Sequence, residues 1–80
     1  MNKEKIYEEL TKIFADVFDD ESIVVAPDMT ADDVDDWDSL SHITLIAEIE
    51  EAFDIKFSMK EVIGMKNISE MVEIIERESL

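Results

Sequence analysis

The sequence predicts an all-α fold, a small four-helix bundle of three main helices and one short helix, with a long first loop. Apolar side chains recur at steps of three and four residues over most of the chain, which is typical of amphipathic helices. There is one glycine, Gly64, and one proline, Pro27, whereas a β-sandwich or barrel needs several turns rich in these residues. Of the 80 residues 46% are hydrophobic, so we expect residues 1–80 to form a single folded domain rather than a disordered acidic tail.

The first helix is predicted from Lys3 to Phe18, with Asn2 as its cap. Its apolar positions follow the helical spacing, at Ile6, Tyr7, Leu10, Ile13, Phe14, Val17 and Phe18. The segment from Asp19 to Trp37 breaks that pattern and forms a connection longer than most in compact domains. Within it, Thr30 is expected to cap a single helical turn in "TADD". The aliphatic residues expected to hold this connection against the core are Ile23, Val24, Val25 and Val34.

The second helix is predicted to begin with Asp38 as N-cap and Ser39 as its first residue, and to run to about Phe53. At 100° per residue, one side is expected to face the core and the other to form a contact surface. The core side carries His42, Leu45, Ile46, Ile49 and Phe53. The contact side carries Ser39, Leu40, Ile43, Thr44, Ala47, Glu50 and Glu51.

Two further helices are predicted after "DIKF". The short one spans about Met59 to Ile63 and is expected to stop at Gly64 in the left-handed conformation that follows many helix ends. The last one has a clear start, because Asn67 followed by Glu70 fits a capping box with Asn as the cap. Its buried stripe is expected at Ile68, Met71, Val72 and Ile75.

The net charge of −15, from 22 acidic and 7 basic residues, argues against a nucleic acid or an anionic membrane surface as a partner and favours a basic protein. The absence of cysteine excludes a disulfide framework, a zinc–cysteine cluster and a nucleophilic thiol of the chain's own. The N-terminus lacks the apolar region of a signal peptide, and no segment has the ~20 apolar residues of a membrane span. We therefore expect a cytoplasmic protein without membrane insertion, and a monomer.

Asp38, Ser39 and His42 could suggest a hydrolytic triad, but no glycine-rich turn or oxyanion hole accompanies them. His42 falls on the core side, where a half-buried ring with one hydrogen-bonded nitrogen is expected. The acidic run "DDVDDWD" does not fit the EF-hand pattern, so no metal site is expected. Ser39 is better interpreted as an exposed hydroxyl at a helix N-terminus, where free amides and the helix dipole stabilise a phosphodiester.

The motif "DSL" at positions 38–40, followed by "LIAEIEEAFDIKFS" and by a final helix from Ile68, resembles the acyl carrier protein family over nearly the whole chain. The resemblance implies that a phosphopantetheinyl transferase attaches 4′-phosphopantetheine from coenzyme A to Ser39. The arm would supply the thiol that a chain without cysteine lacks. The resemblance therefore implies a carrier of acyl thioesters in fatty acid, polyketide or related acyl biosynthesis, and not an enzyme.

The resemblance also implies partners, namely acyl-loading, synthase and acyltransferase enzymes with basic docking patches. The residues assigned to partner contact are Asp38, Leu40, Ile43, Thr44, Ala47, Glu50 and Glu51, with Asp54 and Glu61 as further candidates. An acyl chain is expected to have the option of folding back between helices, along Leu45, Ile49, Ile63 and Ile68. An aliphatic stripe of this kind is more often simple core.

The chain departs from carriers of primary fatty acid synthesis at three positions. Those carriers typically follow "DSL" with an acid and then Thr, whereas this chain has Ser41 and His42, and it places Trp37 before the motif. "WDSLSHI" looks more like carriers of specialised polyketide or other acyl-modifying pathways. Trp37 is expected either to anchor the long loop or to contact a partner. Two alternatives remain: an aminoacyl or peptidyl carrier, and an acidic helical interaction module without a prosthetic group.

Overall fold

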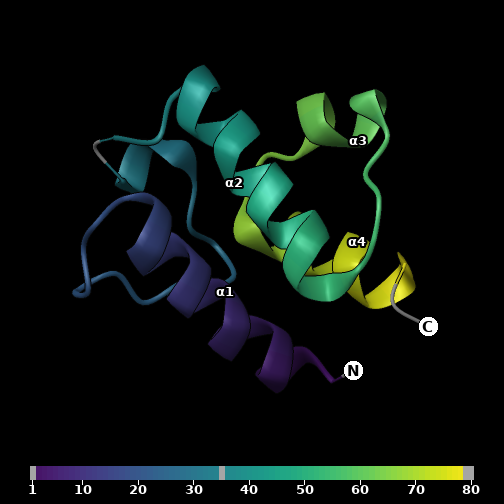
Figure 1. The fold of residues 1–80 in the computed structure, drawn as a ribbon, viewed down its shortest axis with the longest axis horizontal. Helices are drawn as coiled ribbons and strands as arrows, with labels where there is room; N and C mark the ends of the chain where they lie inside the picture. The colour runs from purple at the N-terminus through teal and green to yellow at the C-terminus, as the bar shows by residue number, and fades with distance from the viewer. Residues whose placement is uncertain (1, 35, 79–80) are drawn as a thin grey trace.

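The computed structural model of the chain describes residues 2–34 and 36–78, and it is all-helical in those residues. Its α-helices are α1 (Lys3–Val17), α2 (Ser39–Phe53), α3 (Met59–Gly64) and α4 (Ile68–Glu78), and a short 3₁₀ helix, η1 (Ala31–Asp33), lies in the first connection. Figure 1 shows α1 at the lower left, α2 across the middle with α4 partly behind it, and α3 as a short segment above α4; α1 packs against both α2 and α4. The predicted fold, with three main helices, one short helix and a long first loop, is confirmed.

The helix starts lie at the predicted caps. The Asn2 side chain accepts a hydrogen bond from the Lys5 amide at 2.9 Å, and the Asn67 side chain accepts one from the Glu70 amide at 3.0 Å. Thr30 caps η1, and the Asp33 carboxylate returns to the Thr30 amide at 2.9 Å. Each bond satisfies an amide that has no partner within its own helix. The first helix ends at Val17, so Phe18 is its C-cap rather than its last residue.

The core lies between α1, α2 and α4. The first helix contributes Ile6, Leu10 and Phe14; the second, Leu45, Ile46, Ile49 and Phe53; and the fourth, Ile68, Met71, Val72 and Ile75. Val25 and Ile55 complete it from the connections. None of the six residues of α3 is fully buried, so this helix covers the core without entering it.

The long connection is tied to both α1 and α4. The Val25 amide bonds to the Thr11 hydroxyl at 3.3 Å, and the carbonyls of Pro27 and Met29 accept from the Ser69 and Ile68 amides at 2.9 and 3.0 Å. The first amides of α4 thus find their partners in the loop.

Val25 is buried and Ile23 packs against the core, as predicted, and Val34 is half-buried. The prediction for Val24 was wrong, because its side chain is 72% exposed. In an extended segment successive side chains point to opposite sides, so Val24 points away when its two neighbours point inward.

The predicted left-handed stop at Gly64 was also wrong. Gly64 is the last residue of α3 and has no positive φ, and Met65 continues the chain in an extended conformation. Positive φ angles occur instead at Asp19 and Asp54, with values of 51° and 54°. Aspartate visits this region more readily than most residues because its short polar side chain bonds locally. The chain needs no left-handed turn at Gly64, since the extended link from Met65 leads directly to the cap of α4.

None of the helices in the described part of the chain combines the length and the apolar composition that a membrane crossing requires.

Candidate functional site

Ser39 is the first residue of α2 and is exposed, as predicted. The preceding residue fixes the start of the helix, because Asp38 Oδ1 accepts from the Leu40 amide at 3.1 Å and the Ser41 amide at 3.0 Å. In return, the Ser41 hydroxyl oxygen accepts a hydrogen bond from the Asp38 amide at 2.8 Å. The Ser41 O–H donates to the Asp36 carbonyl oxygen, also at 2.8 Å. This reciprocal capping box leaves the Ser39 side chain outside the network and available to solvent.

The hydrogen bond from the Ser41 amide is the main reason why the pKa of Asp38 lies below its ordinary value. The residue before Ser39 is therefore a carboxylate at neutral pH. Its bonds also correct one expectation, because the amides of Leu40 and Ser41 are not free to receive an anion at Ser39. The remaining attraction for a phosphodiester is the helix dipole, opposed by the charge of Asp38.

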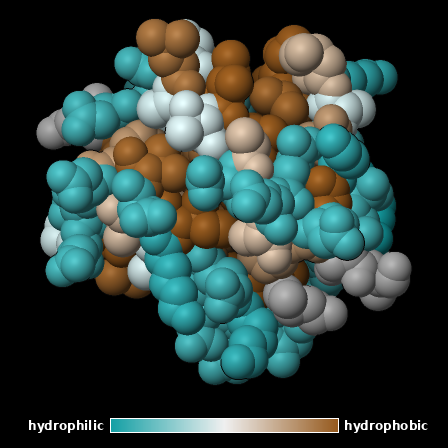
Figure 2. All heavy atoms as spheres, in the orientation of Figure 1, coloured by the Kyte–Doolittle hydropathy of each residue, from teal (hydrophilic) through white to brown (hydrophobic). Residues whose placement is uncertain are grey.

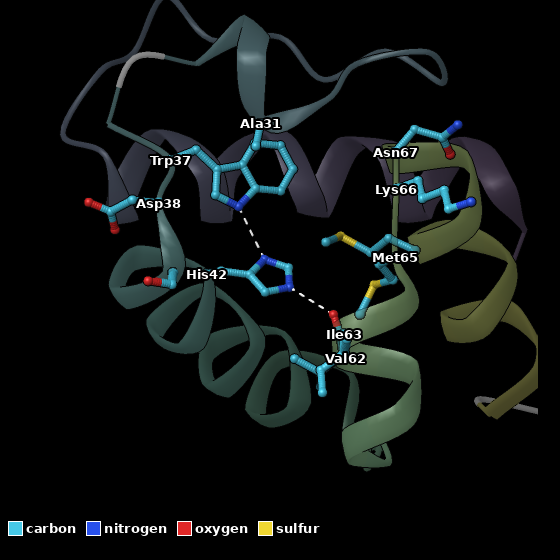
Figure 3. A pocket seen from close by; sticks show the side chains of 11 residues that line it. Ala31, Trp37, Asp38, His42, Val62, Ile63, Met65, Lys66 and Asn67 are labelled. Carbon is cyan, nitrogen blue, oxygen red and sulfur yellow. Dashed lines mark hydrogen bonds between the residues drawn. The ribbon is translucent and has the colours of Figure 1, made fainter.

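His42 is half-buried on the inner side of α2, as predicted, but both of its ring nitrogens are bonded rather than one. The indole N–H of Trp37 donates to His42 Nδ1 at 3.1 Å, and His42 Nε2 lies 3.2 Å from the Val62 carbonyl oxygen (Figure 3). An N–H that donates to Nδ1 requires Nδ1 to be unprotonated, so the proton is on Nε2 and donates to Val62. With both nitrogens engaged, His42 cannot act as a base for Ser39, which removes the triad.

Trp37 anchors the end of the long loop. Its ring meets Phe14 edge-on at a centroid distance of 5.2 Å and stacks on the His42 ring at 6.0 Å. Such aromatic contacts stabilise the fold in addition to the stabilisation that comes from burying the apolar surface of the indole. Of the two roles considered for Trp37, loop anchor is the one that its contacts fit.

A pocket of about 290 Å³ opens beside Ser39, between the loop, α2, α3 and the start of α4. Trp37 and His42 form one wall and Val62, Ile63 and Met65 face them, with Met71 also lining the pocket (Figure 3). Of the residues expected to line an acyl site, Ile63 borders this pocket. The other three, Leu45, Ile49 and Ile68, are fully buried and fill the core. The pocket therefore ends where the packed core begins.

The contact side predicted for α2 is largely exposed. Leu40 and Ile43 are 78% and 64% exposed, and Thr44, Ala47 and Glu51 are also on the surface. Sequence reasoning missed that α3 extends this surface with Met59 and Ile63. Figure 2 shows apolar side chains gathered along the upper edge of the molecule, where Figure 1 places the start of α2 and α3. The two helices together offer exposed apolar side chains close to Ser39.

Two acids assigned to partner contact are used within the fold. Glu50 is half-buried and accepts from the Phe57 amide at 2.8 Å, which fixes the segment after α2. Glu61 belongs to the capping box of α3 with Ser58 and also pairs with Arg77 of α4. The bond from the Ser58 amide is the main cause of a lowered pKa at Glu61. Asp54 is exposed at the end of α2.

The acidic run considered for calcium spans residues 32–38, and Asp35 lies outside the described residues. Among the described residues, no three His, Cys, Asp or Glu side chains gather closely enough to hold a metal ion.

Comparison with known proteins gives consistent matches. The model of the family described as "Phosphopantetheine attachment site" matches residues 8–75. An acyl carrier protein of Coprothermobacter proteolyticus is 32% identical over 78 residues, covering 95% of this chain and 93% of the relative. An acyl carrier protein of Streptococcus pyogenes serotype M3 is 32% identical over 74 residues, covering 92% and 96%.

The fold has a solved counterpart as well. The solution NMR structure of a holo acyl carrier protein from Geobacter metallireducens superposes with a TM-score of 0.85 at 40% sequence identity, covering 90% of this chain and 83% of that one. The chain thus belongs to the acyl carrier protein family, whose members are carriers and not enzymes and hold a 4′-phosphopantetheine group.

Proposed function

We propose that this chain carries acyl intermediates as thioesters on a 4′-phosphopantetheine arm attached to Ser39, and passes them between enzymes of fatty acid, polyketide or related acyl biosynthesis. The observation that carries the proposal is the position of Ser39, an exposed hydroxyl at the first residue of α2, beside a pocket and inside the segment that the family model matches. The residues fit the group, because the capping box holds Asp38 and Ser41 in the fold and leaves Ser39 accessible.

The arm supplies the thiol on which an acyl group is held. The chain's own residues provide attachment and presentation of the arm. His42, the base considered for Ser39, does not activate it, since both of its ring nitrogens are bonded elsewhere. Removal of the serine proton and transfer of the arm are therefore tasks for a separate phosphopantetheinyl transferase.

Docking of that transferase and of the acyl-processing enzymes is assigned to the exposed side of α2. Leu40, Ile43 and Ala47 would bury apolar area against a partner, and Glu51 with Asp38 would orient a basic patch. The net charge of −15 favours fast, salt-sensitive encounter with such a patch. Glu50 keeps its bond to the Phe57 amide and serves this surface mainly through its charge.

Two of the three departures from primary fatty acid carriers, Trp37 and His42, are hydrogen-bonded to each other in the structure. Ser41 completes the cap of α2, and His42 joins Trp37 to α3. Because the bond between Trp37 and His42 requires both residues, these two departures act together, and we propose a specialised acyl pathway. The cargo can be identified by isolating the protein from its native host, cleaving the thioester and measuring the mass of the released group. That mass distinguishes an acyl from an aminoacyl cargo.

The attachment is tested by incubating the purified chain with coenzyme A and a broad-specificity phosphopantetheinyl transferase, followed by intact mass measurement. The unmodified sequence and a Ser41→Ala control should each gain one phosphopantetheine, and Ser39→Ala should gain none. No gain on the unmodified sequence would defeat the carrier proposal and favour an acidic interaction module. A gain on Ser39→Ala would place the arm on another residue.

A further inference from the structure

Three elements of the fold meet at the wall of the pocket beside Ser39. Trp37 closes the first loop, His42 lies on α2, and Val62 belongs to α3. The bonds from Trp37 to His42 and from His42 to the Val62 carbonyl run in series, so the histidine ring spans from the loop to α3 (Figure 3). The stacked indole restrains the ring that makes both bonds.

The position of α3 depends partly on contacts of this kind, because none of its residues is fully buried and only Val62 of this helix packs against the core. Val62 is half-buried, and Met59 and Ile63 are exposed. The ion pair from Glu61 to Arg77 ties α3 to α4, but it lies at the surface, where such pairs stabilise little. The bond from His42 is partly buried and joins α3 to α2 at the pocket itself.

The size of the pocket limits what it can shelter. A volume of about 290 Å³ holds on the order of ten non-hydrogen atoms, taking roughly 30 Å³ for each, the volume of a water molecule in the liquid. Behind the pocket, Leu45, Ile49 and Ile68 are fully buried in the packed core. The part of a longer chain that exceeds this volume either extends into solvent or is sheltered only if α3 moves outward, and that movement breaks the bond between His42 and Val62.

We propose that His42 is a positioning residue that holds α3 against α2 and thereby restricts the pocket to short acyl groups, of on the order of ten non-hydrogen atoms. The proposal rests on the function proposed above, because the acyl group reaches the pocket on an arm attached to Ser39. The partner of His42 is a main-chain carbonyl, so the side chain at position 62 is not required for the bond. The identity of residue 42 is what matters.

Three variants separate the hydrogen bonds from packing. His42→Leu removes both bonds with an apolar side chain that fills part of the site. His42→Gln is the matched control, because its amide offers one acceptor and one donor, as the neutral ring does. Trp37→Phe keeps an aromatic ring against Phe14 and removes the indole N–H together with part of the ring area that stacks on His42.

The first measurement uses the chain without the arm. Hydrogen exchange at the Val62 amide, which is bonded within α3 to Ser58, reports how often α3 opens. Losing one net hydrogen bond should speed this exchange roughly two- to tenfold in His42→Leu, with His42→Gln close to the unmodified protein. If His42→Leu exchanges at the unmodified rate, His42 does not position α3. If His42→Leu fails to fold by circular dichroism, Trp37→Phe tests the restraint on the His42 ring: faster exchange at Val62 than in the unmodified protein supports the proposal, and an unchanged rate contradicts it.

The second measurement uses chains loaded with butanoyl, octanoyl or hexadecanoyl groups, and follows cleavage of the thioester by hydroxylamine. The unmodified protein should protect the two shorter groups relative to their coenzyme A thioesters and leave the hexadecanoyl thioester unprotected. His42→Leu should extend protection to hexadecanoyl, and His42→Gln should not. Equal protection of all three groups in the unmodified protein would overturn the length restriction. Absence of any mass gain with coenzyme A would instead defeat the proposed function, a separate readout.

Discussion

Replacing Gly64 by alanine tests the point at which the structure and the sequence pattern disagree most sharply. The structure places Gly64 at the last position of α3 without a positive φ, and nothing lies within 4 Å of where a Cβ would be. Alanine can adopt this conformation without strain or collision. A left-handed glycine, as the pattern alone predicts, would respond in the opposite way.

The expected change follows from the unfolded chain. Alanine has less backbone freedom than glycine to lose on folding, which stabilises a compatible site by about 0.4–1 kcal/mol. For a domain of this size, 1 kcal/mol corresponds to about 4–8 °C in midpoint, so the Gly64→Ala midpoint should rise by roughly 2–8 °C. The gain is measurable against a total stability of about 4–12 kcal/mol for 80 residues.

Urea denaturation and thermal melting, both followed by circular dichroism, measure the change. Asp54→Ala is the control, because Asp54 has φ and ψ of 54° and 52°, a region that alanine tolerates less well than aspartate. Gly64→Ala should therefore stabilise and Asp54→Ala should destabilise. Loss of stability in both variants would mean that Gly64 is left-handed and that α3 ends as the sequence pattern predicts.

Other changes follow from the core, the caps and the surface charge. Leu45→Ala should cost about 3–5 kcal/mol in urea denaturation, because the residue is fully buried, whereas Leu40→Ala on the exposed side of the same helix should stay within about 0.5 kcal/mol. Asn67→Ala should cost about 1 kcal/mol by the same method, since it removes the cap of α4, and Asn67→Asp should retain most of the stability. The pKa of Asp38 is lowered from 3.8, so the stabilisation that its carboxylate provides is present above pH 3.8 and is lost as the pH falls through the lowered pKa. The melting temperature of Asp38→Asn should therefore fall less steeply with decreasing pH than that of the unmodified protein. Glu51→Lys should slow arm transfer by the transferase at low salt, with the difference shrinking as salt rises; an unchanged rate would remove Glu51 from the docking surface.

Much of the fold could be predicted because its determinants are local. The caps at Asn2, Asp38 and Asn67 each bond an amide two or three residues ahead, so their patterns are visible in a short window of sequence. The buried stripe of α4 follows from helical spacing in the same way. The end of α3 could not be predicted, because a glycine near a helix end is compatible with both a left-handed stop and a last helical turn.

The parts of the site that were missed depend on contacts between distant residues. His42 bonds the carbonyl of a residue 20 positions away, and a main-chain acceptor leaves no signature in the sequence. Glu50 is predicted to contact partners, but its carboxylate accepts a hydrogen bond from the Phe57 amide, seven residues away in the sequence. The family resemblance implies that Ile63 lines an acyl site between helices, yet its side chain is 77% exposed, because α3 lies over the core instead of within it.

The capping of α2 by Asp38 has a consequence for how cargo would travel. Because Asp38 already bonds the amides of Leu40 and Ser41, a phosphate on Ser39 would meet a neighbouring carboxylate and few free donors. An arm attached there would rotate about its ester linkage rather than lie in a fixed direction. The local concentration of its thioester at a partner's active site would then depend on the length and flexibility of the arm, as for any tethered ligand. Handover between enzymes with differently placed active sites would require no rearrangement of the four helices.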